Sequence, residues 1–136
     1  MSTTESEVKV FVEGWDKDHG GCKSFFSELY KFLVSFDKAE VEFHVRQGVT
    51  YSLRARHTGQ TARPLFVMAD VIEAEPRWLS VCFFGDDITD PEECGDFVPG
   101  GLLGEDGHCF DVEVVDDNNK AYILTRIKEA YNSQDK

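Results

Sequence analysis

The stretch CKSFFSELYKFLVSFDKAEVEFHVRQGVTYSLRARH, residues 22–57, contains the two hydrophobic patterns that decide the fold. In its first half, apolar residues such as Phe25, Leu29 and Phe36 recur at steps of three and four. This spacing places them on one face of an α-helix, which we predict from about Gly21 to Phe36. The apolar face of this helix is expected to pack on the core of the domain.

The second half of the stretch changes to the two-residue period of β-strands. Val41, Phe43 and Val45 alternate with polar residues, and a second alternating run extends from Val49 to Leu53. Gln47-Gly48 between the two runs is a turn signal. The sequence therefore predicts two strands joined by a short connection, directly after the helix.

Further elements follow toward the C-terminus. Two nearly continuous apolar runs, 65–72 and 77–84, are separated by a segment containing Pro76 and indicate central strands. The segment HCFDVEVV (108–115) predicts a fifth strand, and KAYILTRIKEAYNSQ (120–134) predicts a closing helix capped by one of the two asparagines before it.

The order of these elements predicts an α+β fold in two layers, a mostly antiparallel five-stranded sheet with N- and C-terminal helices on one face. The 136 residues suit a single domain, 1–136, with one core. Residues 1–18 are predicted as an N-terminal arm or an edge strand, and residues 85–108 as an acidic, glycine-rich crossover. The predicted core comprises Leu29, Phe32, Leu33, Val67, Val81, Phe83 and Ile127.

Charge and composition exclude several classes of function. The sequence has 26 Asp and Glu against 14 Lys and Arg, a net charge of −12, which disfavours contact with nucleic-acid phosphates. No apolar run approaches the roughly 18 residues of a membrane span, and the N-terminus has no signal-peptide pattern. We therefore expect a cytoplasmic protein that binds neither nucleic acid nor membranes, with its four cysteines as reduced thiols.

The negative charge is concentrated in one segment. Between Gly85 and Asp117 lie twelve acidic residues and no Lys or Arg. Three roles stay open for it: a cation site, a patch for a basic partner, or a solvated loop. Its apolar residues Phe97, Leu102 and Leu103 predict that part of it folds back on an arginine-bearing sheet face or on a second subunit.

A resemblance to a family of short uncharacterised bacterial α+β domains is carried by the segments FVEGWDKDHGGCKSFFSELYKFLVSFDKAEVEFHVRQGVTYSLRARH, PLFVMADVI, PRWLSVCFF and HCFDVEVVDDNNKAYILTRIKEAY. The resemblance implies that Arg46, Tyr51, Arg54 and Arg56 occupy the family's basic and aromatic strand positions, and Ala130-Tyr131 its closing pair. It implies the fold and no particular activity.

A basic and aromatic set on the strands supplies the candidate binding residues: Arg46, Tyr51, Arg54, Arg56, Trp78 and His108. If Tyr51 points to the helices, alternation places Arg54 and Arg56 on the other face of the sheet. Because the arginine fork matches carboxylates and phosphates, we predict a small binding or interaction domain. Its arginine face is expected to take a small anionic ligand, an unknown protein partner or the second subunit of a homodimer; ordinary exposed arginines are the alternative.

A small hydrolase-like enzyme is the alternative function, with a cluster of His108, Cys109 and Asp111. A zinc site at Cys94, His108 and Cys109 is not predicted, because their spacing lacks the close pair of ligands typical of zinc sites. The acidic segments do not match a calcium-binding loop either. The sequence therefore predicts no metal and no cofactor.

Overall fold

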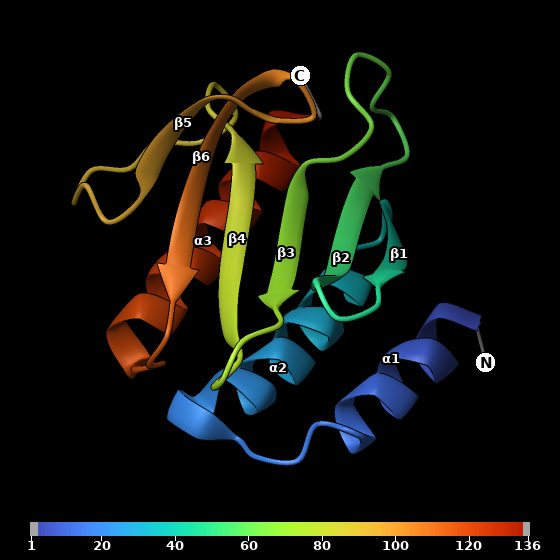
Figure 1. Ribbon diagram of the computed structural model, residues 1–136. Coiled ribbons are helices and arrows are strands. Elements are labelled where there is room, and N and C mark those ends of the chain that lie inside the picture. Colours follow the sequence, from blue (N-terminus) through green and yellow to red (C-terminus); the bar gives the residue numbers. More distant parts are fainter. Residues whose placement is uncertain (1–2, 135–136) are drawn as a thin grey trace.

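The α-helices lie on one face of an antiparallel sheet in the computed structural model, which describes residues 3–134 (Figure 1). Within these residues the helices are α1 (Thr3–Glu13), α2 (Cys22–Val34) and α3 (Asp117–Ser133), and the strands are β1 (Ala39–Arg46), β2 (Thr50–His57), β3 (Val67–Ile72), β4 (Trp78–Phe84), β5 (Asp96–Leu102) and β6 (Glu105–Val112). The strand order is β1-β2-β3-β4-β6-β5, with every neighbouring pair antiparallel. The predicted α+β class is confirmed, with six strands where the sequence predicted five.

The N-terminal segment forms α1, so the prediction of an arm or an edge strand in residues 1–18 is wrong for residues 3–13. Val8, Val10 and Val12 alternate like a strand, but Val8 and Trp15 also fit helical spacing with Phe11. The helical pattern is the one realised: Val8 and Trp15 are buried, whereas Val10 is 70% exposed. The two periods overlap in so short a segment, and packing on the sheet decides between them.

The start of α2 depends on a glycine that approaches another part of the backbone closely. Gly20 has a φ of 66°, and a Cβ there would lie 2.2 Å from the carbonyl oxygen of Glu113. The Asp18 carboxylate accepts a hydrogen bond of 2.9 Å from the Lys23 amide in the first turn of the helix. The helix therefore begins at Cys22, within one residue of the predicted start.

The core between the helices and the sheet contains six of the seven predicted residues in fully buried positions: Leu29, Leu33, Val67, Val81, Phe83 and Ile127. The seventh, Phe32, is only partly buried at the edge of the core, where the Lys128 ammonium lies 5.9 Å from its ring centre. Phe25 and Phe26 occupy the centre of the apolar face instead.

The acidic crossover contains a strand that the sequence did not predict. β5 pairs with β6 at the far edge of the sheet, with a register irregularity between Val98 and Leu102. Pro99 and two glycines lie inside β5, and such residues weaken a strand signal in sequence. Leu102 is buried as predicted, but Phe97 and Leu103 are 60% and 53% exposed and do not anchor the segment.

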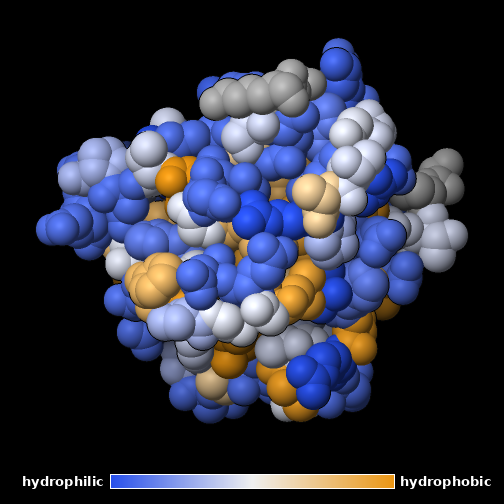
Figure 2. Space-filling view, turned by 90° about the horizontal axis from the view of Figure 1, so that it is seen from above, coloured by the Kyte–Doolittle hydropathy of each residue, from blue (hydrophilic) through white to orange (hydrophobic). Residues whose placement is uncertain are grey.

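The face of the sheet away from the helices, called the open face below, carries a second, smaller core. It consists of Leu65, Met68, Cys82, Phe84 and Leu102, with Cys109 packed against it. Leu102 comes from the end of β5, so the crossover does fold back on the open face. The end of the molecule that holds the β2–β3 loop is mostly hydrophilic, with apolar residues in separate small patches (Figure 2).

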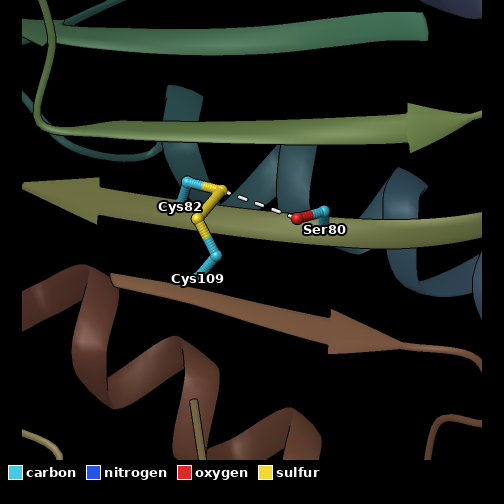
Figure 3. Close-up of a disulfide and its surroundings, with 3 residues drawn as sticks. All are labelled: Ser80, Cys82 and Cys109. Carbon is cyan, nitrogen blue, oxygen red and sulfur yellow. Dashed lines mark hydrogen bonds between the residues drawn. A yellow bond between two sulfur atoms is a disulfide. The ribbon is translucent and has the colours of Figure 1, made fainter. Parts of the chain in front are cut away.

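Cys82 and Cys109 form a disulfide on this face, which differs from the expectation of four reduced thiols. The two residues are direct cross-strand partners on β4 and β6, and their Cα atoms are 4.1 Å apart. Figure 3 shows the pair with the Ser80 hydroxyl, which lies 3.5 Å from the Cys82 sulfur. Sequence spacing contains no information on this pairing, because strand register brings the two cysteines together. Cys22 and Cys94 are free.

Candidate functional site

The candidate binding residues divide between the two faces of the sheet. Arg54 and Arg56 lie opposite Met68 and Glu40, on the open face, as alternation predicted. Arg46 and Trp78 are on the same face, in a row that crosses β1, β2, β3 and β4 as Arg46, Thr50, Ile72 and Trp78. Tyr51 and His108 point to the helix side and do not join them.

A cavity of about 110 Å³ lies over the arginine end of the open face. It is lined by Glu40, Glu42, His44, Arg54, Arg56, Pro64, Leu65 and Leu103. Leu103 belongs to the turn between β5 and β6, so the cavity lies between the sheet face and the acidic crossover. A pocket between the arginine face and the crossover is what a binding domain with a ligand on that face requires.

The charged residues of the cavity are paired in all but one case. Arg56 forms an ion pair of 3.0 Å with Glu40, and the His44 ring nitrogen lies 2.8 Å from Glu42. Arg54 forms no ion pair within residues 3–134, and its one hydrogen bond there is from Nε to the Ser52 hydroxyl, at 3.3 Å. The half-buried guanidinium therefore makes no hydrogen bond from its terminal nitrogens within these residues, although its charge also interacts with the neighbouring Asp70 carboxylate.

Asp70 lies next to Arg54 on the open face, in a row that crosses four strands as Ser52, Asp70, Ser80 and Asp111. Burial raises the pKa of Asp70 above its usual value, although the Ser52 hydroxyl and the Arg54 charge lower it. Its buried Oδ1 has no hydrogen-bond partner. Burial therefore disfavours the ionised form of the Asp70 carboxylate at this position.

We expect the substitution Asp70→Asn to raise the free energy of unfolding by about 1 kcal/mol at pH 7, because it removes a desolvated charge. Because the pKa of Asp70 is raised in the folded protein, the ionised carboxylate lowers stability at neutral pH. This destabilisation disappears as the pH falls through the pKa of the folded protein and the carboxylate becomes protonated. The gain should therefore shrink in urea unfolding at pH 4. Asp111→Asn, an exposed control in the same row, should change stability by less than about 0.5 kcal/mol. A loss of stability in Asp70→Asn would contradict this account.

The counter-charge of the acidic crossover is Arg63. The sequence predicts that the acids of the crossover face outward or turn to Arg54 and Arg56, and within the described residues none of them forms an ion pair with these two arginines. The Arg63 guanidinium contacts Asp86 at 2.6 Å and Glu105 at 3.1 Å, and it lies 4.5 Å from the centre of the Phe84 ring. The hydrogen bond to Asp86 chiefly raises the pKa of Arg63 above its usual value. Arg63 comes from the β2–β3 loop, whose position relative to the crossover cannot be seen in sequence.

A second arginine cluster on the helix side was also missed by sequence reasoning. Arg77 donates from Nε and Nη2 to Glu73 at 3.1 and 2.8 Å, and Glu73 accepts from the Tyr51 hydroxyl at 3.0 Å. The guanidinium lies 5.2 to 5.4 Å from the ring centres of Phe11, Trp15 and Tyr51. Tyr51 is therefore engaged in the packing of α1 against the sheet.

His108 takes part in a hydrogen-bond hub centred on Asp90. The Asp90 carboxylate accepts from the His108 ring at 2.8 Å, from the Tyr122 hydroxyl at 2.5 Å and from the amides of Cys94 and Gly95 at 3.0 and 2.9 Å. Burial raises the pKa of Asp90, but these hydrogen bonds outweigh it and hold the pKa well below its usual value. The hub ties the start of the crossover to β6 and α3.

The catalytic cluster of the enzyme alternative is not assembled. His108 points to the helix side, whereas Cys109 and Asp111 lie on the open face and Cys109 is bonded to Cys82. Desolvation and the nearby carboxylate of Asp90 raise the pKa of the exposed Cys94 thiol, which lowers the fraction of reactive thiolate. Within the described residues the His108 ring has Asp90 as its hydrogen-bond partner and forms no hydrogen bond with a thiol.

The candidate zinc ligands do not converge, and within residues 3–134 no three His, Cys, Asp or Glu side chains form a metal-binding group. No helix in this part of the chain is long and apolar enough to cross a membrane. Comparison with protein-family models, curated proteins and solved structures found no match to this chain. The resemblance to a bacterial family therefore stays a prediction.

Proposed function

We propose that this protein is a small binding domain that holds the anionic group of a small ligand at Arg54. The observation that supports this most is the missing ion pair: Arg54 is half-buried and bonded to the Ser52 hydroxyl alone within the described residues. Arg56, Arg63, Arg77 and Arg126 each pair with a carboxylate, and Arg46, which also forms no ion pair within the described residues, is exposed rather than half-buried. A planar guanidinium with open donors suits a carboxylate or a phosphate group.

The surroundings of Arg54 suit such a group. The cavity volume of about 110 Å³ is well below that of a pocket for a whole metabolite, so it admits the anionic group, and the rest of the ligand lies over the open face. Leu65, which is buried, and Leu103 also line the cavity, and apolar walls strengthen the attraction between a guanidinium and an anion. The desolvated Asp70 beside it is a stability cost of the kind found at functional sites.

Thermal unfolding in the presence of anions tests this proposal. Sodium phosphate, sodium acetate and sodium succinate are compared at one ionic strength, so that nonspecific screening is constant. At ten times its dissociation constant, a bound anion should raise Tm by about 5 °C. The phosphate and carboxylate arms identify which group is preferred.

Two variants test whether the rise in Tm is due to binding at Arg54. Arg54→Gln should abolish the rise in Tm, whereas Lys31→Gln, which removes the same charge from an exposed position on α2, should retain it. No rise with any of the three anions, or an unchanged rise in Arg54→Gln, would contradict binding at Arg54.

A further inference from the structure

The outer edge of β1 is open to pairing, in contrast to the other edge of the sheet. β1 is an edge strand, at one end of the strand order, and pairs with β2 alone in an unbroken register from Ala39 to Arg46. The opposite edge strand, β5, has Pro99 and a register irregularity, features that block pairing with another chain. β1 contains neither proline nor bulge.

The backbone of β1 presents regular hydrogen-bonding groups to solvent. The Thr58 amide donates to the Lys38 carbonyl at 2.8 Å, so even-numbered residues of β1 direct their backbone groups toward β2. Alternation then leaves the N–H and C=O groups of Val41, Phe43 and Val45 at the open edge. A further antiparallel strand would satisfy them.

We propose that two copies of this chain pair through β1, antiparallel about a two-fold axis at Phe43, to form one continuous sheet. The sequence of β1 is self-complementary in this register. Glu40 lies opposite the partner's Arg46, Glu42 opposite the partner's His44, Val41 opposite the partner's Val45, and Phe43 opposite its own copy. The two-fold axis forms each unlike pair twice.

Neighbouring registers lack this match. Moving the partner by two residues in one direction places Glu42 opposite its own copy and Lys38 opposite Arg46, so that like charges meet. Moving it in the other direction retains one unlike pair, Glu42 with Arg46, but places Glu40 opposite Gly48 in the turn and His44 opposite its own copy. A shift by one residue would place the polar row of one copy on the same face as the apolar row of the other.

The apolar side chains of β1 on the helix side, Val41, Phe43 and Val45, are only partly covered in the single chain. On the helix side, Val45 is 48% exposed, and Val10 of α1 is 70% exposed close to it. A groove of about 500 Å³ lies there, lined by Ser6, Glu7, Val10, Phe11, Gly14, Phe43, Val45, Gln47, Tyr51 and Arg77. In the dimer, the partner's Val41 and Phe43 cover this groove and bury the exposed valines.

Pairing would also change the anion site, a consequence that rests on the proposed function. Glu40 and Glu42 line the cavity at Arg54 and oppose an anion there. The partner's Arg46, opposite Glu40, balances part of this negative charge. The dimer itself depends only on the edge of β1 and is measured without any anion.

A charge exchange tests both the surface and the register. Sedimentation velocity of the parent should show dimers at about 100 μM that dissociate on dilution. Glu40→Arg and Arg46→Glu each convert two unlike pairs of the dimer into like pairs, so each should weaken self-association by at least about 30-fold. An equimolar mixture of the two variants restores every unlike pair and should form heterodimers within about threefold of the parent affinity.

Circular dichroism and thermal unfolding check that each variant is folded. Both variants should fold normally, because Glu40 and Arg46 are exposed. Glu40→Arg also removes the ion pair between Glu40 and Arg56 within the chain, which mixing cannot restore. Recovery on mixing therefore reports the intermolecular pair. A parent that stays monomeric at about 500 μM, variants that remain dimeric, or a mixture without heterodimers would each overturn the proposal. Loss of anion binding with the dimer intact would count against the proposed function alone.

Discussion

Replacement of Phe26 by alanine is expected to lower the free energy of unfolding by about 4 kcal/mol, within the range for a large aromatic side chain removed from a core. The Phe26 side chain is completely buried on α2. Its ring centre lies 5.6 Å from that of Phe11 on α1 and 6.3 Å from that of Phe43 on β1. The cavity would thus open where α1, α2 and the sheet meet, and the rigid sheet limits how far it can collapse.

Urea unfolding followed by circular dichroism measures this loss, and Phe32→Ala is the matched control. Phe32 is on the same helix but only partly buried, so its removal should cost about 2 kcal/mol. Equal losses at the two positions would contradict the assignment of Phe26 to the centre of the core. A loss below about 1 kcal/mol for Phe26→Ala would mean that α1 does not pack on α2 as described.

The second large effect is expected at Asp90. The substitution Asp90→Ala should cost about 3 kcal/mol at pH 7, because it leaves His108, Tyr122 and two backbone amides without their shared acceptor. The exposed Asp96 on β5 offers a control, since Asp96→Ala should change stability by less than about 0.5 kcal/mol. Similar losses in the two variants would mean that the hub contributes nothing specific.

The pH dependence of the Asp90 effect has a defined sign. Because the fold lowers the pKa of Asp90, its contribution is complete above the unfolded carboxyl value near 4 and is lost as the pH falls toward the folded value. The difference between the parent protein and Asp90→Ala should therefore be constant from about pH 5 to 7 and decrease below about pH 4. A difference that grows in acid would contradict the lowered pKa.

The two-residue period of the strands separates the two faces of the sheet, but of the six predicted binding residues only Arg54 and Arg56 line the cavity. Alternation put Arg54 and Arg56 on the face opposite Tyr51, and the structure shows Tyr51 on the helix side and the two arginines on the open face. The same rule, applied to residues 108–111, already argues against the cluster of His108 with Cys109, because neighbours on a strand point in opposite directions. The unpaired state of Arg54 could not be predicted, since it depends on where every nearby carboxylate lies.

Local patterning was sufficient to predict α2, the β1–β2 pair, the central strands and the closing helix, because helical and strand periods are local properties of the chain. It was ambiguous for α1, where both periods fit, and silent for β5, whose glycines and proline mask a strand held in place by β6.

Only the tertiary structure decided which groups meet. Asp90 with His108, Cys82 with Cys109, and Arg63 with Glu105 are separated by 18, 27 and 42 residues along the chain. Their contacts follow from strand register and loop paths, which are determined by the packing of the whole domain. Periodicity assigns a residue to a face, and long-range packing supplies its partner.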